Sequence, residues 1–129
     1  MPPNWELPEK AVRQMPVDGD GRVPEFIQVL TTTASEGDAR KIAGALVEER
    51  LAACVQVVGP ITSTYRWQGA VERAQEFLCF IKTRAEAYSR VEERIRQLHP
   101  YEVPEIVALP ITAASAAYLA WIDGEVARQ

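Results

Sequence analysis

The spacing of apolar and polar residues between positions 26 and 126 follows two patterns, one typical of β-strands and one typical of helices. Phe26–Thr32 is short and rich in β-branched residues, which is typical of a strand. Ser35 then begins a weak capping box with Asp38. After this capping box, apolar side chains recur at helical spacing at Ala39, Ile42, Ala43, Leu46 and Val47. We therefore expect one strand followed by a helix over Ser35–Arg50.

The middle of the chain predicts a long hairpin. Ala53–Trp67 is strand-like but contains Gly59-Pro60, which we expect to bend the strand or to force a bulge. Gln68-Gly69 is a turn dipeptide, and it leads into a third strand over Val71–Thr83. The two strands are therefore expected to pair directly.

The remaining segments complete an α+β pattern. Ala85–Leu98 has apolar side chains on one helical face, Glu105–Ile111 is a short apolar strand, and Ala113–Val126 has the pattern of a closing helix. The order βαββαβ with an added C-terminal helix predicts a ferredoxin-like sheet with its helices on one face.

Two of the predicted strands are apolar on both faces. Phe77–Ile81 and Ile106–Leu109 contain only apolar residues, whereas the two helices can cover only one side of a sheet. The other side would expose more apolar surface than the few hundred Å² that soluble monomers tolerate. We infer that other copies of the chain bury it.

Composition narrows the class of protein. The chain has 129 residues, of which 47% are hydrophobic, and lacks the apolar run of ~20 residues that spans a bilayer. Met1–Pro24 contains five prolines and no periodicity, which predicts an extended or disordered arm before a single soluble domain over residues 25–129. A net charge of −4 argues against nonspecific binding to nucleic acid.

The N-terminus and the cysteines predict a cytoplasmic protein. The first residues lack the basic and apolar regions of an export signal. Cys54 and Cys79 lie in apolar segments and form no CxxC pair, so we expect reduced, buried thiols.

Four motifs, in this order, carry a family resemblance: Glu49–Val55, Tyr65–Gly69, Phe80–Thr83 and His99–Ile106. Together they resemble the divalent-cation tolerance (CutA) family over about Phe26–Ile122. The resemblance implies a ferredoxin-like subunit in a tight homotrimer, similar in architecture to the nitrogen-regulatory PII proteins. It also implies a link to copper and other divalent cations.

Cys54, Cys79 and His99 are the candidate metal ligands, because copper and zinc select thiolate and imidazole donors. They are not neighbours in the sequence. Metal capture would therefore need the trimer to bring donors together, or it would be weak and confined to the surface. Each residue also has a structural interpretation, the cysteines as small apolar residues in strands and the histidine as a hydrogen-bonded loop residue.

By resemblance, a second set of residues forms a cleft between subunits, where a small anion or metabolite would meet a lysine and aromatic walls. This set comprises Tyr65, Trp67, Lys82, Tyr101, Glu102 and Glu105. The alternative for these residues is interface packing with one ion pair between Lys82 and a carboxylate.

Three functional hypotheses follow. The first is a trimeric copper-binding or metal-response protein without catalysis, which requires no cofactor and has copper or another divalent cation as its ligand. The second is a PII-like sensor with a small metabolite or nucleotide in its intersubunit clefts. The third is a small ferredoxin-like oxygenase with His99 and Trp67 in its site. The expected partners are copies of the chain and a metal ion or small molecule, not nucleic acid or a membrane.

We expect the chain to form a trimer that persists at low micromolar concentration, since the Phe77–Ile81 strand is apolar on both faces. Light scattering after size exclusion measures the mass. A monomer of 14.4 kDa would contradict the predicted assembly, and a dimer would contradict the trimer that the resemblance implies.

Overall fold

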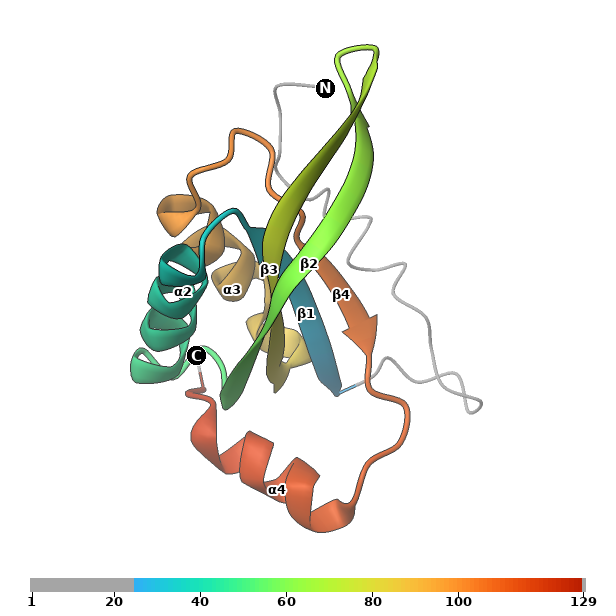
Figure 1. Cartoon of the computed structure of the whole chain (residues 1–129). Helices are drawn as coiled ribbons and strands as arrows, with labels where there is room; N and C mark the ends of the chain where they lie inside the picture. The colour runs from blue at the N-terminus through green and yellow to red at the C-terminus, as the bar shows by residue number, and fades with distance from the viewer. Residues whose placement is uncertain (1–24, 129) are drawn as a thin grey trace.

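The computed structural model describes residues 25–128 of the chain, so the predicted arm Met1–Pro24 lies outside the described residues. The elements follow in the predicted order βαββαβ with a C-terminal helix (Figure 1). They are β1 (Phe26–Thr33), α2 (Glu36–Glu48), β2 (Cys54–Trp67), β3 (Ala70–Arg84), the 3-10 helix η1 (Ala85–Ala87), α3 (Tyr88–Leu98), β4 (Val107–Pro110) and α4 (Ala116–Glu125).

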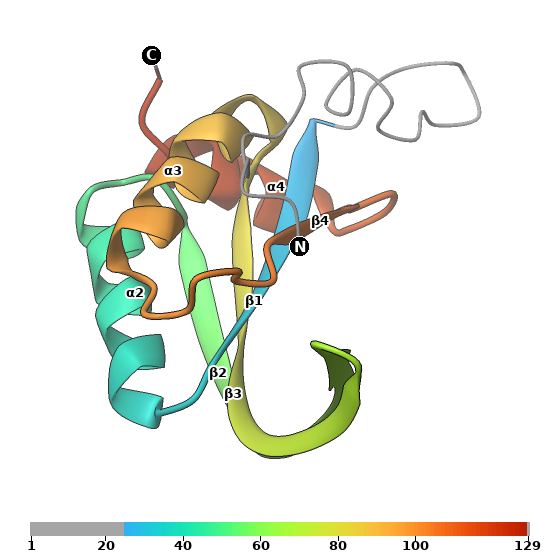
Figure 2. The same ribbon diagram turned by 90° about the horizontal axis from the view of Figure 1, so that it is seen from above.

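The four strands form one antiparallel sheet in the order β2-β3-β1-β4. Helices α2 and α3 lie side by side on one face of it (Figure 2). The core fills the space between the two layers with side chains such as Ile27, Val29, Ile42, Leu46, Ile81, Val91 and Ile95. Burying an aliphatic side chain of this size stabilises the fold by roughly 1.5–3 kcal/mol, so this layer holds the helices to the sheet.

The β2–β3 hairpin extends well beyond the sheet. Strand β1 pairs with β3 only over Phe77–Arg84, so the part of β3 before Phe77 pairs with β2 alone and projects as a two-stranded ribbon (Figure 1). Gln68 and Gly69 close the ribbon with φ of 49° and 85°, the pair of positive values that a type I′ hairpin turn requires. The predicted Gln68-Gly69 turn is therefore confirmed.

The bend predicted at Gly59-Pro60 is also present, as a register shift between Val58 and Ile61. A Cβ atom at position 59 would overlap the ring of Phe77 on the neighbouring strand. Glycine is therefore required here because the two strands approach closely, and the bulge marks where the hairpin leaves the sheet.

Two predicted boundaries were too wide at the C-terminal end. The fourth strand is Val107–Pro110 rather than Glu105–Ile111, because only four residues pair with β1. The last helix begins at Ala116 rather than Ala113, because the Ser115 Oγ accepts the backbone N–H of Tyr118 at 3.2 Å and caps the helix.

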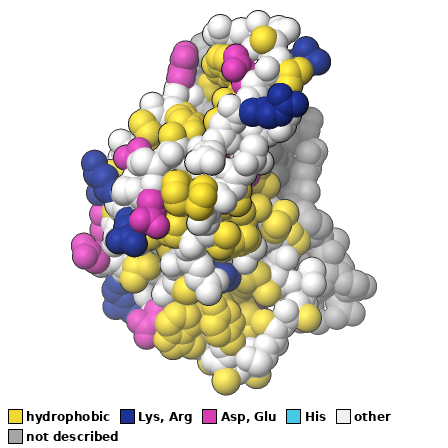
Figure 3. Space-filling view, in the orientation of Figure 1, with side chains coloured by type: hydrophobic (Ala, Val, Ile, Leu, Met, Phe, Trp, Pro, Cys, Tyr) yellow, Lys and Arg dark blue, Asp and Glu magenta, His cyan; other side chains and the backbone are white. Residues whose placement is uncertain are grey.

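The sheet face away from α2 and α3 remains apolar and exposed. Leu30, Leu78 and Phe80 are half-buried there, while Val107 and Leu109 keep 44% and 45% of their surface exposed. Figure 3 shows hydrophobic side chains gathered over this face and over α4. The prediction that the helices cover only one face of these apolar strands is confirmed.

Two of the fully buried threonines, Thr31 and Thr83, provide a test of packing. The Thr83 hydroxyl donates to Leu51 O at 2.6 Å, whereas the Thr31 hydroxyl has no hydrogen-bond partner among the described residues. We expect Thr31→Val to leave the free energy of unfolding unchanged or raise it by up to about 1 kcal/mol, and Thr83→Val to lower it by about 1–3 kcal/mol, since it orphans a carbonyl. Urea unfolding measures both. Equal losses in the two variants would contradict this assignment.

Candidate functional site

His99 lies buried at the C-terminal end of α3, with 8% of its surface exposed. Its Nε2 is 2.6 Å from Thr32 O, and its Nδ1 accepts the backbone N–H of Tyr101 at 3.1 Å. Since a carbonyl oxygen only accepts, Nε2 carries the proton. Both ring nitrogens are thus occupied within the chain, and metal ligation would have to break one of these bonds.

Tyr101 continues from His99 toward the base of the ribbon. Its ring centroid is 4.8 Å from that of His99, and its hydroxyl donates to Glu76 Oε2 at 2.8 Å. Burial, the hydrogen bond to Glu76 and nearby charges raise the pKa of Tyr101, so the hydroxyl stays a donor. Partial burial and the charge of Glu76 also raise the pKa of Glu105. We refer to Glu76, His99, Tyr101 and Glu105 as the loop cluster.

Cys79 faces the helices in the centre of β3 and is fully buried, with its Sγ 3.9 Å from Ala39 O. Burial raises the pKa of its thiol to about 11. The side chain is therefore a protonated thiol in an apolar layer, which is a poor metal ligand because metals bind the thiolate.

Cys54 begins β2 and is half-buried. It is the register partner of Lys82, so the two side chains share the sheet face away from α2 and α3. The Lys82 Nζ donates to Gln56 Oε1 and lies 5.7 Å from the centroid of the Phe80 ring. Burial and, to a lesser degree, the charge of Cys54 raise the pKa of Tyr118 at the start of α4. We call Cys54, Gln56, Lys82 and Tyr118 the sheet-end cluster.

One chain does not bring the three predicted metal ligands together. Cys79 and Lys82 are an odd number of residues apart in β3, so Cys79 and Cys54 lie on opposite faces of the sheet. His99 contacts Thr32 near the C-terminal end of β1, whereas Cys54 is level with the N-terminal end of that strand. Between residues 25 and 128, no three His, Cys, Asp or Glu side chains form a group that could hold a metal ion. Metal binding by this set stays a prediction.

The six predicted cleft residues fall into separate regions of one chain. Tyr65 and Trp67 belong to the ribbon, and Tyr65 is close enough to Tyr101 to affect its pKa. Tyr101 and Glu102 line an open hollow of about 370 Å³ beside α3, together with Glu93, Arg96, Gln97 and Pro104. Lys82 stands apart, since Glu76 lies six residues earlier on β3, or roughly 20 Å away in a strand.

The ion pair considered for Lys82 is not among the described contacts, where its hydrogen-bond partner is the amide of Gln56. Sequence reasoning also missed Glu76, which is 7% exposed and holds the Tyr101 hydroxyl. The sequence could have indicated this residue, because Glu76 directly precedes the apolar Phe77–Ile81 segment and a carboxylate at the edge of a buried strand needs a hydrogen-bond donor.

Residues 27–125 match the family model described as CutA1 divalent ion tolerance protein. The Divalent-cation tolerance protein CutA of Thermus thermophilus is 56% identical over 94 residues, which are 73% of this chain and 91% of that protein. The chain belongs to the CutA1 divalent ion tolerance family. The resemblance predicted from four motifs is thus confirmed.

Other relatives support the CutA1 assignment. Protein CutA of Mus musculus is 42% identical over 108 residues, which are 83% of this chain but only 61% of the mouse protein. The crystal structure of CutA1 from Oryza sativa has a TM-score of 0.80 at 35% identity and covers 82% of this chain and 97% of that chain. A CutA structure from Archaeoglobus fulgidus, described as periplasmic, has a TM-score of 0.77 at 37% identity over 79% of this chain and 99% of that chain.

Two further observations concern the other hypotheses for this CutA1 chain. Trp67 ends β2 at the tip of the ribbon, while His99 is buried under the loop, so the pair suggested for an oxygenase is not assembled in one chain. Within residues 25–128, no helix combines the length and the apolar character of a membrane span.

The Tyr101–Glu76 bond gives a direct test of the loop cluster. We expect Tyr101→Phe to lower the free energy of unfolding by about 1–3 kcal/mol at neutral pH, because it leaves a buried carboxylate without its donor. Tyr118→Phe is the matched control, since its more exposed hydroxyl makes no hydrogen bond to the described residues. Urea unfolding of both variants decides, and an equal loss would show that the Tyr101 hydroxyl is not a structural donor.

Proposed function

We propose that the chain is a homotrimeric copper-binding or metal-response protein that acts by binding, without catalysis, in the cytoplasm. Its membership of the divalent ion tolerance family supports the link to divalent cations. The exposed apolar sheet face, with Val58 at 47% exposure as well as Val107 and Leu109, supports burial against other copies.

The accessibility of Cys54 carries the metal part of the proposal. Of the three predicted donors, Cys79 holds its proton in the core and His99 uses both nitrogens within the chain. Cys54 is only half-buried, and its sulfur makes no hydrogen bond among the described contacts. Because thiolate sulfur suits copper(I) best, we assign copper(I) to this residue.

A single thiolate leaves copper(I) under-coordinated, so the site needs donors from more than one copy. Cys54 lies on the same sheet face that we expect to be buried in the trimer. Assembly and metal binding are therefore linked in this proposal, since the partner copies would supply the missing ligands.

The loop cluster favours a second candidate, a PII-like sensor of a small metabolite or nucleotide. The charge of Tyr65 contributes to the raised pKa of Tyr101, and Tyr101 and Glu102 line the hollow beside α3. Aromatic walls with a few polar groups are typical of small-molecule sites. In this function Lys82 would join the cleft from a neighbouring copy, because it is distant in its own chain.

Copper titration tests the first proposal. We expect Cys54→Ser to weaken copper(I) binding at least tenfold under reducing conditions, and Cys79→Ala to leave it within about twofold, because the Cys79 thiol is buried and protonated. Affinity should fall as the pH is lowered, since protons compete for the sulfur. Competition calorimetry gives the constants.

Light scattering of each variant must first show the parent's mass, because a buried serine hydroxyl at position 54 without a partner costs about 1–3 kcal/mol and disturbs assembly. A properly assembled Cys54→Ser variant that binds copper(I) as tightly as the parent would contradict the proposal. A metabolite or nucleotide that raises the melting temperature while copper does not would favour the sensor.

A further inference from the structure

Helix α4 has an apolar surface that the described residues leave uncovered. Its first seven residues, Ala116–Ile122, include no charged side chain, and a helix that is apolar all round is normally buried. Only Ile122 of these seven is fully buried, while Tyr118 and Trp121 keep 38% and 44% of their surface exposed. Figure 3 shows hydrophobic side chains gathered over this helix. A covering partner is therefore expected here.

Tyr118 and Trp121 form one surface on α4, which we call the aromatic stripe. Leu119 and Ile122 are three residues apart and pack toward the core. Tyr118 and Trp121 each precede one of them, which turns them about 100° around the helix from the core-facing side. Their ring centroids are 5.7 Å apart and their planes differ by 31°. The two rings therefore present a continuous aromatic surface to the outside.

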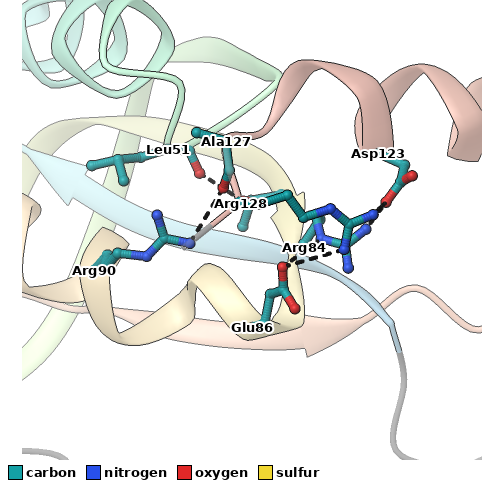
Figure 4. A network of polar contacts seen from close by, with 8 residues as sticks. Leu51, Arg84, Glu86, Arg90, Asp123, Ala127 and Arg128 are labelled. Carbon is teal, nitrogen blue, oxygen red and sulfur yellow. Dashed lines mark hydrogen bonds and ion pairs between the residues drawn. The ribbon is translucent and has the colours of Figure 1, made fainter.

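The N-terminal arm joins the described domain beside this helix. Glu25 O accepts the backbone N–H of Ala85 at 2.8 Å, which fixes the first described residue against the end of β3. Arg84, the preceding residue, pairs with Asp123 of α4 (Figure 4). The same guanidinium lies 5.9 Å from the centroid of the Phe26 ring. Arg84 thus links the start of β1 to α4, and the arm begins close to the aromatic stripe.

The arm is long enough to reach the stripe. Asp123 lies two residues after Trp121, so the stripe is within roughly 20 Å of Glu25. From Pro8 to Glu25 the chain advances 17 residues, and a flexible chain of that length has an r.m.s. end-to-end distance of about 23 Å. A tether that matches its span gives an effective concentration of about millimolar, so a weak contact is sufficient.

The sequence of the arm is suited to an aromatic surface. Pro2, Trp5 and Pro8 are spaced by three residues, and we call them the proline edge. A polyproline II helix has three residues per turn, so in that conformation these side chains would share one edge. Proline-rich segments dock in aromatic-lined grooves in this conformation, because it is preformed and little entropy is lost on binding. The aromatic stripe has the chemistry that such a segment binds.

We propose that the N-terminal arm docks on α4, with its proline edge on the aromatic stripe. The family match covers residues 27–125, so the arm lies outside the matched domain, and this contact is independent of the proposed metal or metabolite binding. Other copies of the chain are the alternative occupant. They are expected on the exposed sheet face, whereas α4 lies across the end of the sheet, beside the start of the arm (Figure 1). The tethered arm is therefore favoured.

The fluorescence of Trp121 tests the contact in the full chain. A reporter chain with Trp5→Phe and Trp67→Phe leaves Trp121 as the only tryptophan and keeps an aromatic side chain at position 5. The test chain has Trp5→Ala and Pro8→Ala together with Trp67→Phe, which removes most of the proline edge. We expect acrylamide to quench Trp121 about twofold more strongly in the test chain, with emission at longer wavelength, because its ring becomes solvated.

A second arm variant is the matched control. Val12→Ala with Pro16→Ala, added to the reporter chain, also removes one apolar side chain and one proline but leaves the proline edge intact. Its quenching should equal that of the reporter. Equal quenching in the reporter and the test chain, or the same increase in the control, overturns the proposal. Light scattering gives the mass of each chain, and exposure of Trp121 only where the mass falls would show that another copy covers α4, which also overturns it.

Cleavage of the arm gives a second readout. The arm contains Lys10 and Arg13, and trypsin cuts after them only when the segment is free to enter the protease. We expect Trp121→Ala to speed this cleavage about threefold or more. Val47→Ala is the matched control, because it removes a similarly exposed apolar side chain from α2 and should leave the rate unchanged. An unchanged rate in Trp121→Ala that circular dichroism shows to be folded, or an equal increase in Val47→Ala, contradicts docking on the aromatic stripe.

Discussion

The apolar character of both faces of β3 is the constraint on which the rest of the structure depends. Cys79 and Ile81 are fully buried against the helices, while Leu78 and Phe80 point to the other face and remain half-buried. Because β3 pairs with both β1 and β2, it occupies a central position where the two helices can cover only one side. The placement of α2 and α3 on one side of the sheet and the exposed apolar surface on the other side both follow from this one strand.

The parts of the fold that were predicted correctly depend on local chemistry. Ser35 caps α2 by accepting the Asp38 N–H, and Gln68-Gly69 adopts the positive φ values of a hairpin turn, both of which the neighbouring residues specify. The start of α4 was missed because three alanine or serine positions continue the helical pattern, and only the cap by Ser115 decides among them.

The candidate site was less predictable because its contacts join distant positions. His99 meets Thr32, Tyr101 meets Glu76, and Arg50 meets Gly124, and no periodicity or motif spacing reports such pairs. The residue types did indicate which side chains lie close together, since the rings of His99 and Tyr101 pack against each other. It did not reveal that both histidine nitrogens would be occupied, because this depends on where the carbonyl of Thr32 lies in the folded chain.

These contacts share a pattern that bears on function. Side chains of the family motifs bind the main chain of distant elements: His99 binds Thr32 O, and Arg50 binds the end of α4. Glu49, next in sequence, accepts hydrogen bonds from the Arg94 side chain of α3 through both carboxylate oxygens. A motif residue engaged in this way stabilises the subunit, and its polar atoms are not free for a ligand. Of the three predicted metal donors, only the sulfur of Cys54 is neither fully buried nor hydrogen-bonded among the described contacts. The proposed metal-binding role therefore centres on the sheet end, where Cys54 lies half-buried on the exposed apolar face.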